Sequence, residues 1–399
     1  MHLPHLPGSV HLTYCTNIHA ADSWPDISSS LDEHVPAIRA AVAAGQPFGI
    51  GLRLSGRASL ELSQPAALAA FQAQLTRLGA YVFTINAFPY GPFHGEQVKE
   101  RVYQPDWCQH ERVAFTLRCA EILALLLPTG MTGSISSVPG AFKAELTAPG
   151  TMQEIAEHIV DAVAGLIEIK RRTGRHIVLA LEPEPCCMLE TVDETLAFFA
   201  EYLFAAAARE RVARSTGLSA DAAEAALRGH VGVCYDVCHG AVEFEDPALA
   251  LGRLKAAGIG IAKIQLSSAM RVPVMQASLV PALRCFDDGV YLHQVVVKGK
   301  SVLRYVDLPQ ALAAFEQGLA DGEWRVHCHV PVFLGDLGEI GTTQRQLQIT
   351  LDALKAQAFS NHLEVETYTW DVLPEALKTS NKAQAIAREL SFVVGALGA

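Results

Sequence analysis

The chain has 399 residues, of which 50% are hydrophobic and 18% are charged. This composition supports a large buried core and excludes an intrinsically disordered chain. The 31 basic and 42 acidic residues give a formal charge of −11. Nucleic-acid-binding proteins usually carry a basic footprint, so no nucleic-acid partner is expected.

The chain also lacks the sequence features of secreted and membrane proteins. No secretory signal is visible at its start, and no apolar run reaches the ~18 residues that a membrane span needs. The nine cysteines form no disulfide framework of a small secreted domain. We therefore expect reduced thiols, a cytoplasmic location and no membrane span.

Predicted strands and helices alternate along the first half of the chain. Strands are predicted at 11–17, 48–53, 81–86 and 132–138, and helices at 31–44, 65–78, 111–127 and 152–172. The second half continues this alternation. Strands are predicted at 177–182, 231–236, 259–267, 323–330 and 362–367, and helices at 193–227, 247–257, 342–356 and 374–397.

This alternation predicts an α/β protein with a (β/α)8 TIM barrel, formed by one domain over residues 1–399. Residues 290–305 have the pattern of a β-hairpin, which we place in an insertion at 268–322, after strand seven. One strand is then too many, so the strand at 259–267 or that at 323–330 must lie at the barrel mouth. A doubly wound open sheet is the alternative, but no Gly-rich first turn supports it.

Three of the predicted apolar strands end at or near a carboxylate. These carboxylates are Glu182, which two prolines follow closely, Asp236 and Glu366. The carboxyl ends of barrel strands share one face, so we expect the three side chains to form one site. Buried acidic groups are costly unless they are paired or bind a metal.

Histidines accompany these carboxylates. His239 lies three residues after Asp236, and His327 and His329 alternate on the predicted strand at 323–330. Carboxylates and imidazoles together suit Zn, Mn, Mg or Fe, so a divalent metal is the expected cofactor. The expected ligands are Glu182, Asp236, His239, His327, His329 and Glu366. The alternative is a polar network closed by Arg53 and Lys263.

Two positions leave the choice of ligand open. Glu364 and Glu366 point to the same side of their strand, and Glu366 lies nearer the tip. Glu184 follows a proline that breaks the alternation, so it could replace Glu182. Further residues near strand ends are expected to bind the substrate: Asn17, His19, Arg53, Asn86, Phe88, Tyr90, His94, Glu184, Gln265, Glu364 and Trp370. Phe88, Tyr90, Phe93 and Trp370 would form an apolar wall that excludes water.

The segment Asp236-Val237-Cys238-His239 resembles the Asp-x-x-His motif of the xylose-isomerase-like barrel superfamily, which includes endonuclease IV and the ketose 3-epimerases. Glu182 and Glu366 resemble the metal-binding glutamates on the fifth and eighth strands of that superfamily. The resemblance covers roughly residues 10–375 and implies a metal site on these strands. One departure stands out. Where the superfamily usually has a metal-binding histidine on strand seven, this chain has Gln265, so His327 or His329 would have to replace it.

The chain also resembles the EboE family of metabolite-traffic proteins. This resemblance rests on the segments at 12–19, 86–94, 103–107 and 364–370. It implies a role in a pathway that processes or moves small metabolites.

These features favour a metal-dependent isomerase or epimerase that acts on a small polyhydroxy or oxo metabolite. Two carboxylates, Glu182 or Glu184 and Glu366 or Glu364, would move the proton next to a carbonyl. Lys263 or Arg53 would stabilise the enediolate.

There are two alternatives. One is a non-catalytic metabolite-binding or traffic protein with a degenerate metal site, and the other is an endonuclease-IV-like phosphodiesterase, which the acidic charge disfavours. The position of His327 and His329 relative to the carboxylates separates the metalloenzyme from the binding protein. The oligomeric state, including a homodimer, is left open.

Overall fold

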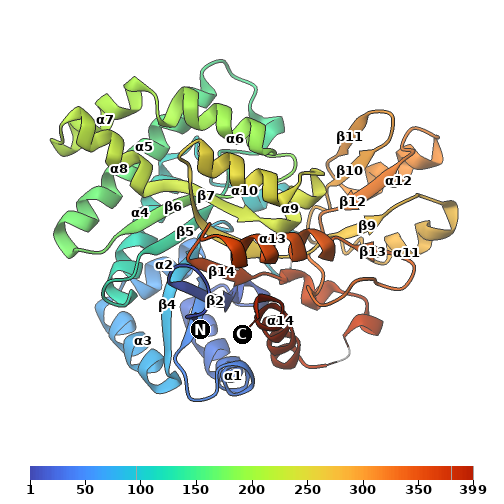
Figure 1. Ribbon diagram of the computed structural model, residues 1–399, viewed down its shortest axis with the longest axis horizontal. Helices are drawn as coiled ribbons and strands as arrows, with labels where there is room; N and C mark the ends of the chain where they lie inside the picture. The colour runs from blue at the N-terminus through green and yellow to red at the C-terminus, as the bar shows by residue number, and fades with distance from the viewer. Residues whose placement is uncertain (96, 379, 399) are drawn as a thin grey trace.

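The computed structural model describes residues 1–95, 97–378 and 380–398 (Figure 1). Eight parallel strands form its central barrel, as predicted, in the order β2, β14, β8, β7, β6, β5, β4 and β3. In chain order they are β2 (Val10–Tyr14), β3 (Phe48–Arg53), β4 (Ala80–Asn86), β5 (Gly133–Ser137), β6 (Ile177–Leu181), β7 (Val231–Asp236), β8 (Gly260–Leu266) and β14 (His362–Val365). The short strand β1 (His2–Leu3) pairs antiparallel with β2.

The barrel closes between β2 and β3, where side chains take part in the strand pairing. Cys15 and Gly51 form a parallel bridge. The Thr13 hydroxyl donates to the Gly49 carbonyl at 2.8 Å and accepts from the Gly51 N–H at 3.0 Å. These contacts satisfy backbone groups that an open sheet edge would leave unpaired.

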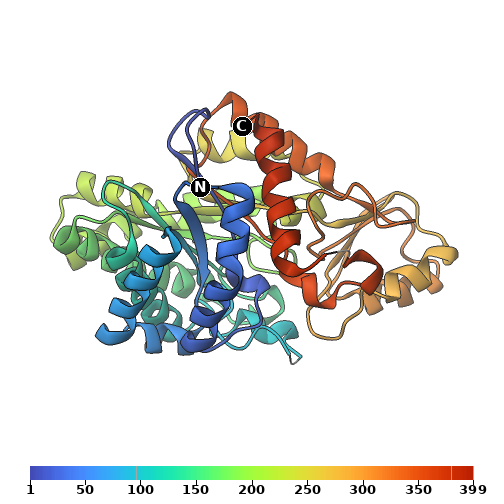
Figure 2. The same cartoon turned by 90° about the horizontal axis from the view of Figure 1, so that it is seen from below.

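Helices surround the barrel (Figures 1 and 2). The longer ones are α1 (Trp24–Val42), α3 (Pro65–Leu78), α4 (His110–Leu126), α5 (Thr151–Thr173), α7 (Ala206–Thr216), α8 (Ala220–His230), α10 (Pro247–Ala256), α13 (Gln344–Ala356) and α14 (Lys382–Leu397). The shorter ones are α2 (Gly56–Leu62), α6 (Val192–Phe198) and α9 (Val237–Val242). Helix α5 illustrates their local signals, because it has basic residues in its last turn and ends at Gly174 in the left-handed conformation.

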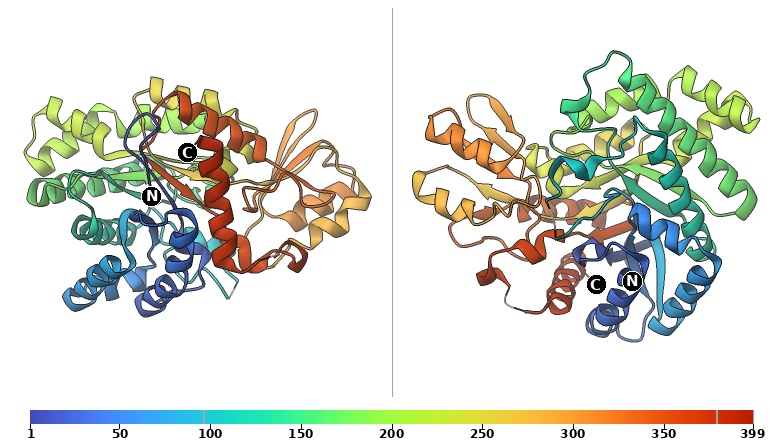
Figure 3. Two further views of the ribbon diagram at one scale, coloured as in Figure 1. Left: turned by 60° about the horizontal axis from the view of Figure 1, so that its bottom comes forward. Right: turned by 180° about the vertical axis from the view of Figure 1, so that it is seen from behind.

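A second sheet lies at one side of the barrel, seen in orange in Figures 1 and 3. It is antiparallel, with the order β11-β10-β12-β9-β13. Its strands are β9 (Met270–Val272), β10 (Val295–Lys298), β11 (Val302–Tyr305), β12 (Glu323–Val326) and β13 (Gly341–Thr342), and it carries helices α11 (Val280–Arg284) and α12 (Leu308–Glu316). The predicted hairpin is its β10–β11 pair.

The strand pairing shows which of the two candidate strands lies outside the barrel. Strand β8 pairs with β7 and β14 inside the barrel, whereas β12 pairs with β9 and β10 in the second sheet. The second sheet therefore extends to Thr342, beyond the 268–322 expected for the insertion. The strand expected at 323–330 ends at Val326, so His327 and His329 lie on an irregular segment after it.

None of the helices in the described ranges is long and apolar enough to cross a membrane. All nine cysteines are free thiols.

The barrel interior predicts the effect of one small substitution. A Cβ atom at Gly51 would clash with the Glu364 carboxylate and lie 2.8 Å from the Tyr14 carbonyl oxygen. We expect Gly51→Ala to lower the free energy of unfolding by about 1–3 kcal/mol, the usual cost of overpacking, in urea denaturation.

Gly252 is the matched control, because it is exposed in α10 and a Cβ there has no atom within 4 Å. Gly252→Ala should stabilise the protein by roughly 0.5–1 kcal/mol. Equal effects of the two substitutions would contradict the packing described for Gly51.

Candidate metal centre

Three carboxylates meet at the carboxyl ends of the barrel strands. Glu182 follows β6, Asp236 ends β7 and Glu366 follows β14. All three are buried, and each offers an oxygen that lies within 4.8 Å of the other two. The convergence predicted from the strand ends is therefore present in the fold.

Asp236 has one oxygen engaged and one free. As the N-cap of α9, its Oδ1 accepts from the backbone N–H of Cys238 at 2.7 Å and of His239 at 3.2 Å. The Ser267 hydroxyl also donates to Oδ1, at 2.6 Å. Oδ2 is buried and has no hydrogen-bond partner. The protein thus fixes the carboxylate through one oxygen and leaves the other available to a ligand.

Each of the two glutamates shows one half of this pattern. Glu366 Oε1 accepts from the side-chain amides of Asn17 at 2.8 Å and Asn86 at 3.1 Å. Glu182 Oε2 is buried without a hydrogen-bond partner. Leaving such oxygens buried and unsatisfied is costly, so this arrangement favours a bound cation.

Three histidines present a ring nitrogen to this centre. Their Nδ1 atoms lie 2.9 Å from the Pro183 carbonyl for His239, 2.7 Å from Gln294 Oε1 for His327, and 2.9 Å from the Glu366 carbonyl for His329. Since these oxygens only accept, each Nδ1 carries the hydrogen, and each ring in its neutral form has its lone pair on Nε2. This is the usual way in which proteins orient a metal-binding histidine.

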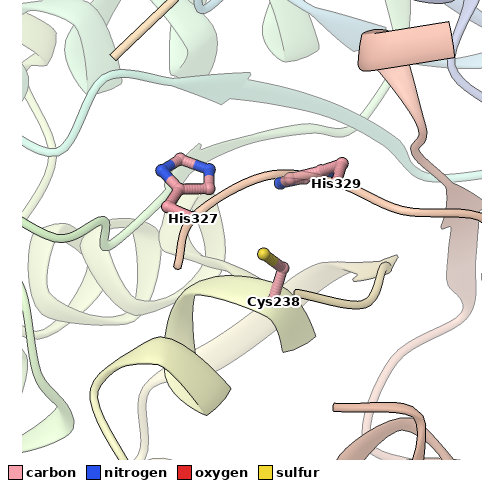
Figure 4. Close-up of side chains that lie close together, drawn as sticks. All are labelled: Cys238, His327 and His329. Atoms are coloured by element: carbon pink, nitrogen blue, oxygen red, sulfur yellow. The ribbon is translucent and has the colours of Figure 1, made fainter. Parts of the chain in front are cut away.

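The Nε2 atoms of His239 and His327 face each other, and those of His239 and His329 lie near Asp236. His239 Nε2 lies 3.1 Å from His327 Nε2, and His329 Nε2 lies 3.9 Å from Asp236 Oδ2. Figure 4 shows His327 and His329 on one segment of chain, with the Cys238 sulfur pointing toward them from α9. His329 therefore reaches Asp236 of the carboxylate cluster, whereas His327 groups with His239 and Glu184. Contact of either histidine with the carboxylates was the feature expected to separate a metalloenzyme from a binding protein.

The charges at the centre are unbalanced. Burial raises the pKa of Glu182 to about 7, and burial together with the neighbouring carboxylates raises the pKa of Glu366 well above its usual value. Lys263, a nearby buried cation, is 2.5 Å from Glu364 and is therefore paired. Burial lowers the pKa of His329 to about 4, which leaves this imidazole neutral and able to bind a metal.

A cavity opens above these residues. On its polar side lie Asn17, Asn86, Glu182, Glu184, His239, His327 and Glu366. On its apolar side, the rings of Phe93, Tyr291 and Tyr368 pack with centroids 5.1–5.2 Å apart. Tyr291 belongs to the insertion, and its hydroxyl donates to the Phe93 carbonyl at 2.9 Å. The insertion thus supplies part of the cavity wall.

The cavity brings together four of the eleven residues expected to bind a substrate. Asn17, Asn86, Phe88 and Glu184 line it. Tyr90 instead packs on Phe115 and donates to Glu111, and Trp370 is buried elsewhere. The apolar wall is therefore only partly the one expected.

Arg53, His19 and His94 lie outside the cavity lining. Arg53 donates to the carbonyls of Ala21 and Gly91. His19 bonds to the Tyr14 hydroxyl, and His94 bonds to the Asn17 carbonyl and the Tyr291 hydroxyl. These contacts hold the loops around the centre.

Lys263, Glu364 and Gln265 lie inside the barrel and do not line the cavity. Lys263 and Glu364 form a fully buried ion pair. Both amide atoms of Gln265 are buried without a hydrogen-bond partner. His329 belongs to two of the candidate ligand groups, one with Asp236 and His239 and one with Cys238 and His327.

Sequence reasoning missed several residues of the site. Tyr103, Tyr291, Leu292 and Tyr368 line the cavity, and Gln294 orients His327. Tyr103 and Tyr368 stand in segments that the EboE resemblance had singled out. No pattern in the sequence indicated that Gln294 would contact His327, because that contact depends on how the second sheet docks.

Comparison with known proteins leaves the family open. No family model matches the sequence, and no curated protein matches it. Among solved structures, an L-ribulose 3-epimerase is similar at 14% identity, with 97% of this chain and 94% of that chain covered and a TM-score of 0.47. The 3-keto-D-glucoside 4-epimerase YcjR from E. coli has 16% identity, 97% and 100% coverage and a TM-score of 0.43. The zinc-bound IOLI protein has 12% identity, 97% and 98% coverage and a TM-score of 0.48.

Glu389 of α14 connects the two segments that carry Glu366 and His329. It accepts from the Thr367 hydroxyl at 2.6 Å and from the Val332 N–H at 3.1 Å. Burial raises its pKa to about 7. This residue therefore links the stability of the site to pH.

We predict that Glu389 makes the protein less stable as pH rises from about 4.5 to 7. In this window the unfolded chain has lost the proton that the native state retains, so the free energy of unfolding falls with pH. Glu389→Gln should remove this slope and gain up to about 3 kcal/mol over the parent above pH 7. Urea denaturation at pH 5 and pH 8 measures the effect. Exposed Glu339→Gln is the control, and parallel pH profiles of parent and Glu389→Gln would contradict the prediction.

Proposed function

We propose that this protein is a divalent-metal-dependent isomerase or epimerase that acts on a small polyhydroxy or oxo metabolite. The observation that carries the proposal is the group of three buried carboxylates, two of which have an oxygen without any hydrogen-bond partner. A neutral imidazole, His329, faces the same place. This donor set of oxygen and nitrogen atoms fits Zn, Mn, Mg or Fe.

The residues that would coordinate the metal are Glu182, Asp236, His329 and Glu366. Asp236 and Glu366 each have one oxygen held by protein donors, so little ordering is needed when a cation binds. When bound, the metal would polarise a substrate carbonyl as a Lewis acid. His329 takes the role that the superfamily gives to a strand-seven histidine, which Gln265 replaces in this chain.

Glu182 and Glu366 are the proposed proton carriers. They come from β6 and β14, which two other strands separate in the barrel. Both line the cavity, and both have raised pKa values because they are buried. One carboxylate would take the proton next to the carbonyl, and the other would return a proton to the same or the neighbouring carbon. Asn17 and Asn86 orient Glu366 for this transfer.

The cavity favours an uncharged ligand. Lys99 is the cation in its lining, and this ammonium lies 2.5 Å from the Asp307 carboxylate. A phosphate or carboxylate of a substrate would therefore compete with Asp307 and face the acidic side of the cavity. The same features, with the net charge of −11, disfavour a phosphodiesterase that binds nucleic acid.

A non-catalytic role in metabolite traffic, which the EboE resemblance implied, remains a prediction. A traffic protein would bind its metabolite in the same cavity as the proposed enzyme but would not catalyse proton transfer.

Metal content and proton exchange test the proposal together. Purified parent protein should contain bound divalent metal when measured by plasma mass spectrometry. The variants Asp236→Asn and Glu366→Gln should lose most of the metal bound at the carboxylates, because each substitution removes the charge of one ligand. The exposed variant Glu339→Gln should keep the metal content of the parent.

In heavy water, the metal-loaded parent should introduce deuterium next to the carbonyl of an uncharged ketose or hydroxyketone, followed by NMR. Glu366→Gln should slow this exchange at least 100-fold, as expected for loss of a general acid–base group. A parent that takes up no Zn, Mn or Fe(II) after dialysis would refute the proposal. Metal binding without exchange on any such compound would favour the traffic role.

A further inference from the structure

Two of the four candidate ligand groups share no residue, although a third group, Asp236, His239 and His329, shares one residue with each of them. One is the carboxylate group of Glu182, Asp236 and Glu366, and the other is Glu184, His239 and His327. Within each group, the ligand atoms lie within 4.8 Å of one another. The second group was not needed for the proton transfer described above, so it calls for its own explanation.

The two imidazoles of this second group conflict in the neutral state. His239 donates from Nδ1 to the Pro183 carbonyl, and His327 donates from Nδ1 to Gln294 Oε1. Both Nε2 atoms then carry a lone pair, yet they face each other at 3.1 Å. Two lone pairs at this distance repel, so a cation must lie between or beside them. A proton is the smallest such cation, and a metal ion bound by both nitrogens is the other.

The side-chain amide of Gln294 determines this arrangement. Its Nε2 donates to the Tyr103 hydroxyl at 2.8 Å, which leaves Oε1 to accept from His327. The Tyr103 hydroxyl donates in turn to Glu184 Oε1 at 2.8 Å. One buried network thus fixes the third ligand and the histidine at the same time.

The surroundings of the second group distinguish a metal site from a merely buried network. Glu184, His239 and His327 are each more than nine-tenths buried, yet all three line the cavity. Two imidazoles and one carboxylate, with an open side toward a cavity, form the ligand set of many catalytic zinc sites. The barrel supplies Glu184 and His239, and the insertion supplies His327 and the Gln294 that orients it.

We propose that Glu184, His239 and His327 form a second divalent-cation site, separate from the carboxylate site and completed by the insertion. The chemical class of the ion is a borderline cation such as Zn²⁺, because two of the three ligands are imidazoles. Since both sites border one cavity, the second ion would bind a further oxygen of the same polyhydroxy or oxo metabolite. In this respect the inference rests on the proposed function.

Metal stoichiometry of the full-length protein tests the second site. Protein stripped with a chelator is titrated with Zn²⁺ in a calorimeter, and the retained metal is counted by mass spectrometry. The parent should bind two equivalents. His327→Gln should bind one, because an amide is a poor zinc ligand, and Glu366→Gln should keep the equivalent at the imidazoles. The far-ultraviolet circular dichroism of each variant checks that it is folded.

Gln294 provides a matched pair of variants that leave all ligands in place. Gln294→Leu removes the acceptor for His327 and should weaken one of the two Zn²⁺ equivalents about 10–100-fold, the usual effect of losing such a partner. Gln294→Glu keeps an acceptor for His327 and should weaken the binding of that Zn²⁺ equivalent less than Gln294→Leu does. Neither variant should change the affinity of the carboxylate site. Equal affinities in the parent and Gln294→Leu would contradict the assigned role.

The outcomes separate the two proposals. If the parent binds one equivalent of Zn²⁺ and His327→Gln still binds it, the second site is overturned and the proposed function stays intact. Two equivalents that are both lost in His327→Gln would also overturn it, because the ligands would then form one cluster. No Zn²⁺ binding in the parent would overturn both proposals.

Discussion

The structure depends on one electrostatic constraint, the burial of carboxylates at the ends of barrel strands. Glu182, Asp236 and Glu366 meet away from water, and Lys263 is already paired with Glu364. Protonation relieves part of the cost, as the raised pKa values of Glu182 and Glu366 indicate. A divalent cation would relieve more of it, because one ion offsets several charges. The free oxygens, the oriented imidazoles and the enclosing wall are all consistent with a site built for that ion.

The barrel and the insertion form this centre jointly. The barrel places the carboxylates and His239, whereas the segment after β12 brings His327 and His329 over them. Contacts across the boundary fix the position of the insertion. Arg304 of β11 pairs with buried Glu243, and Lys99 pairs with Asp307. Because ligands come from both parts, metal binding and docking of the second sheet would stabilise each other.

The parts of the fold that follow local rules could be predicted from the sequence. Apolar strands that end at Glu182 and Asp236 indicated both the barrel and the face of the site, since strand ends converge in this architecture. The surplus strand could not be assigned, because the segments at 259–267 and 323–330 both have strand-like patterns and only long-range pairing separates them. Arg53 and Tyr90 were expected in the site because they lie near strand ends. Their side chains instead bond to loop carbonyls and to Glu111, which spacing alone does not reveal. The role of Gln294 likewise depends on tertiary docking.

The central claim is that a divalent cation occupies the carboxylate group. The most direct measurement is an anomalous difference map from crystals grown with Mn²⁺, collected at a wavelength where manganese scatters anomalously. The account predicts a strong peak about 2.0–2.3 Å from oxygens of Glu182, Asp236 and Glu366 and from Nε2 of His329. A map without a peak at these four residues, in crystals that contain Mn²⁺ at concentrations that saturate known manganese enzymes, would contradict it.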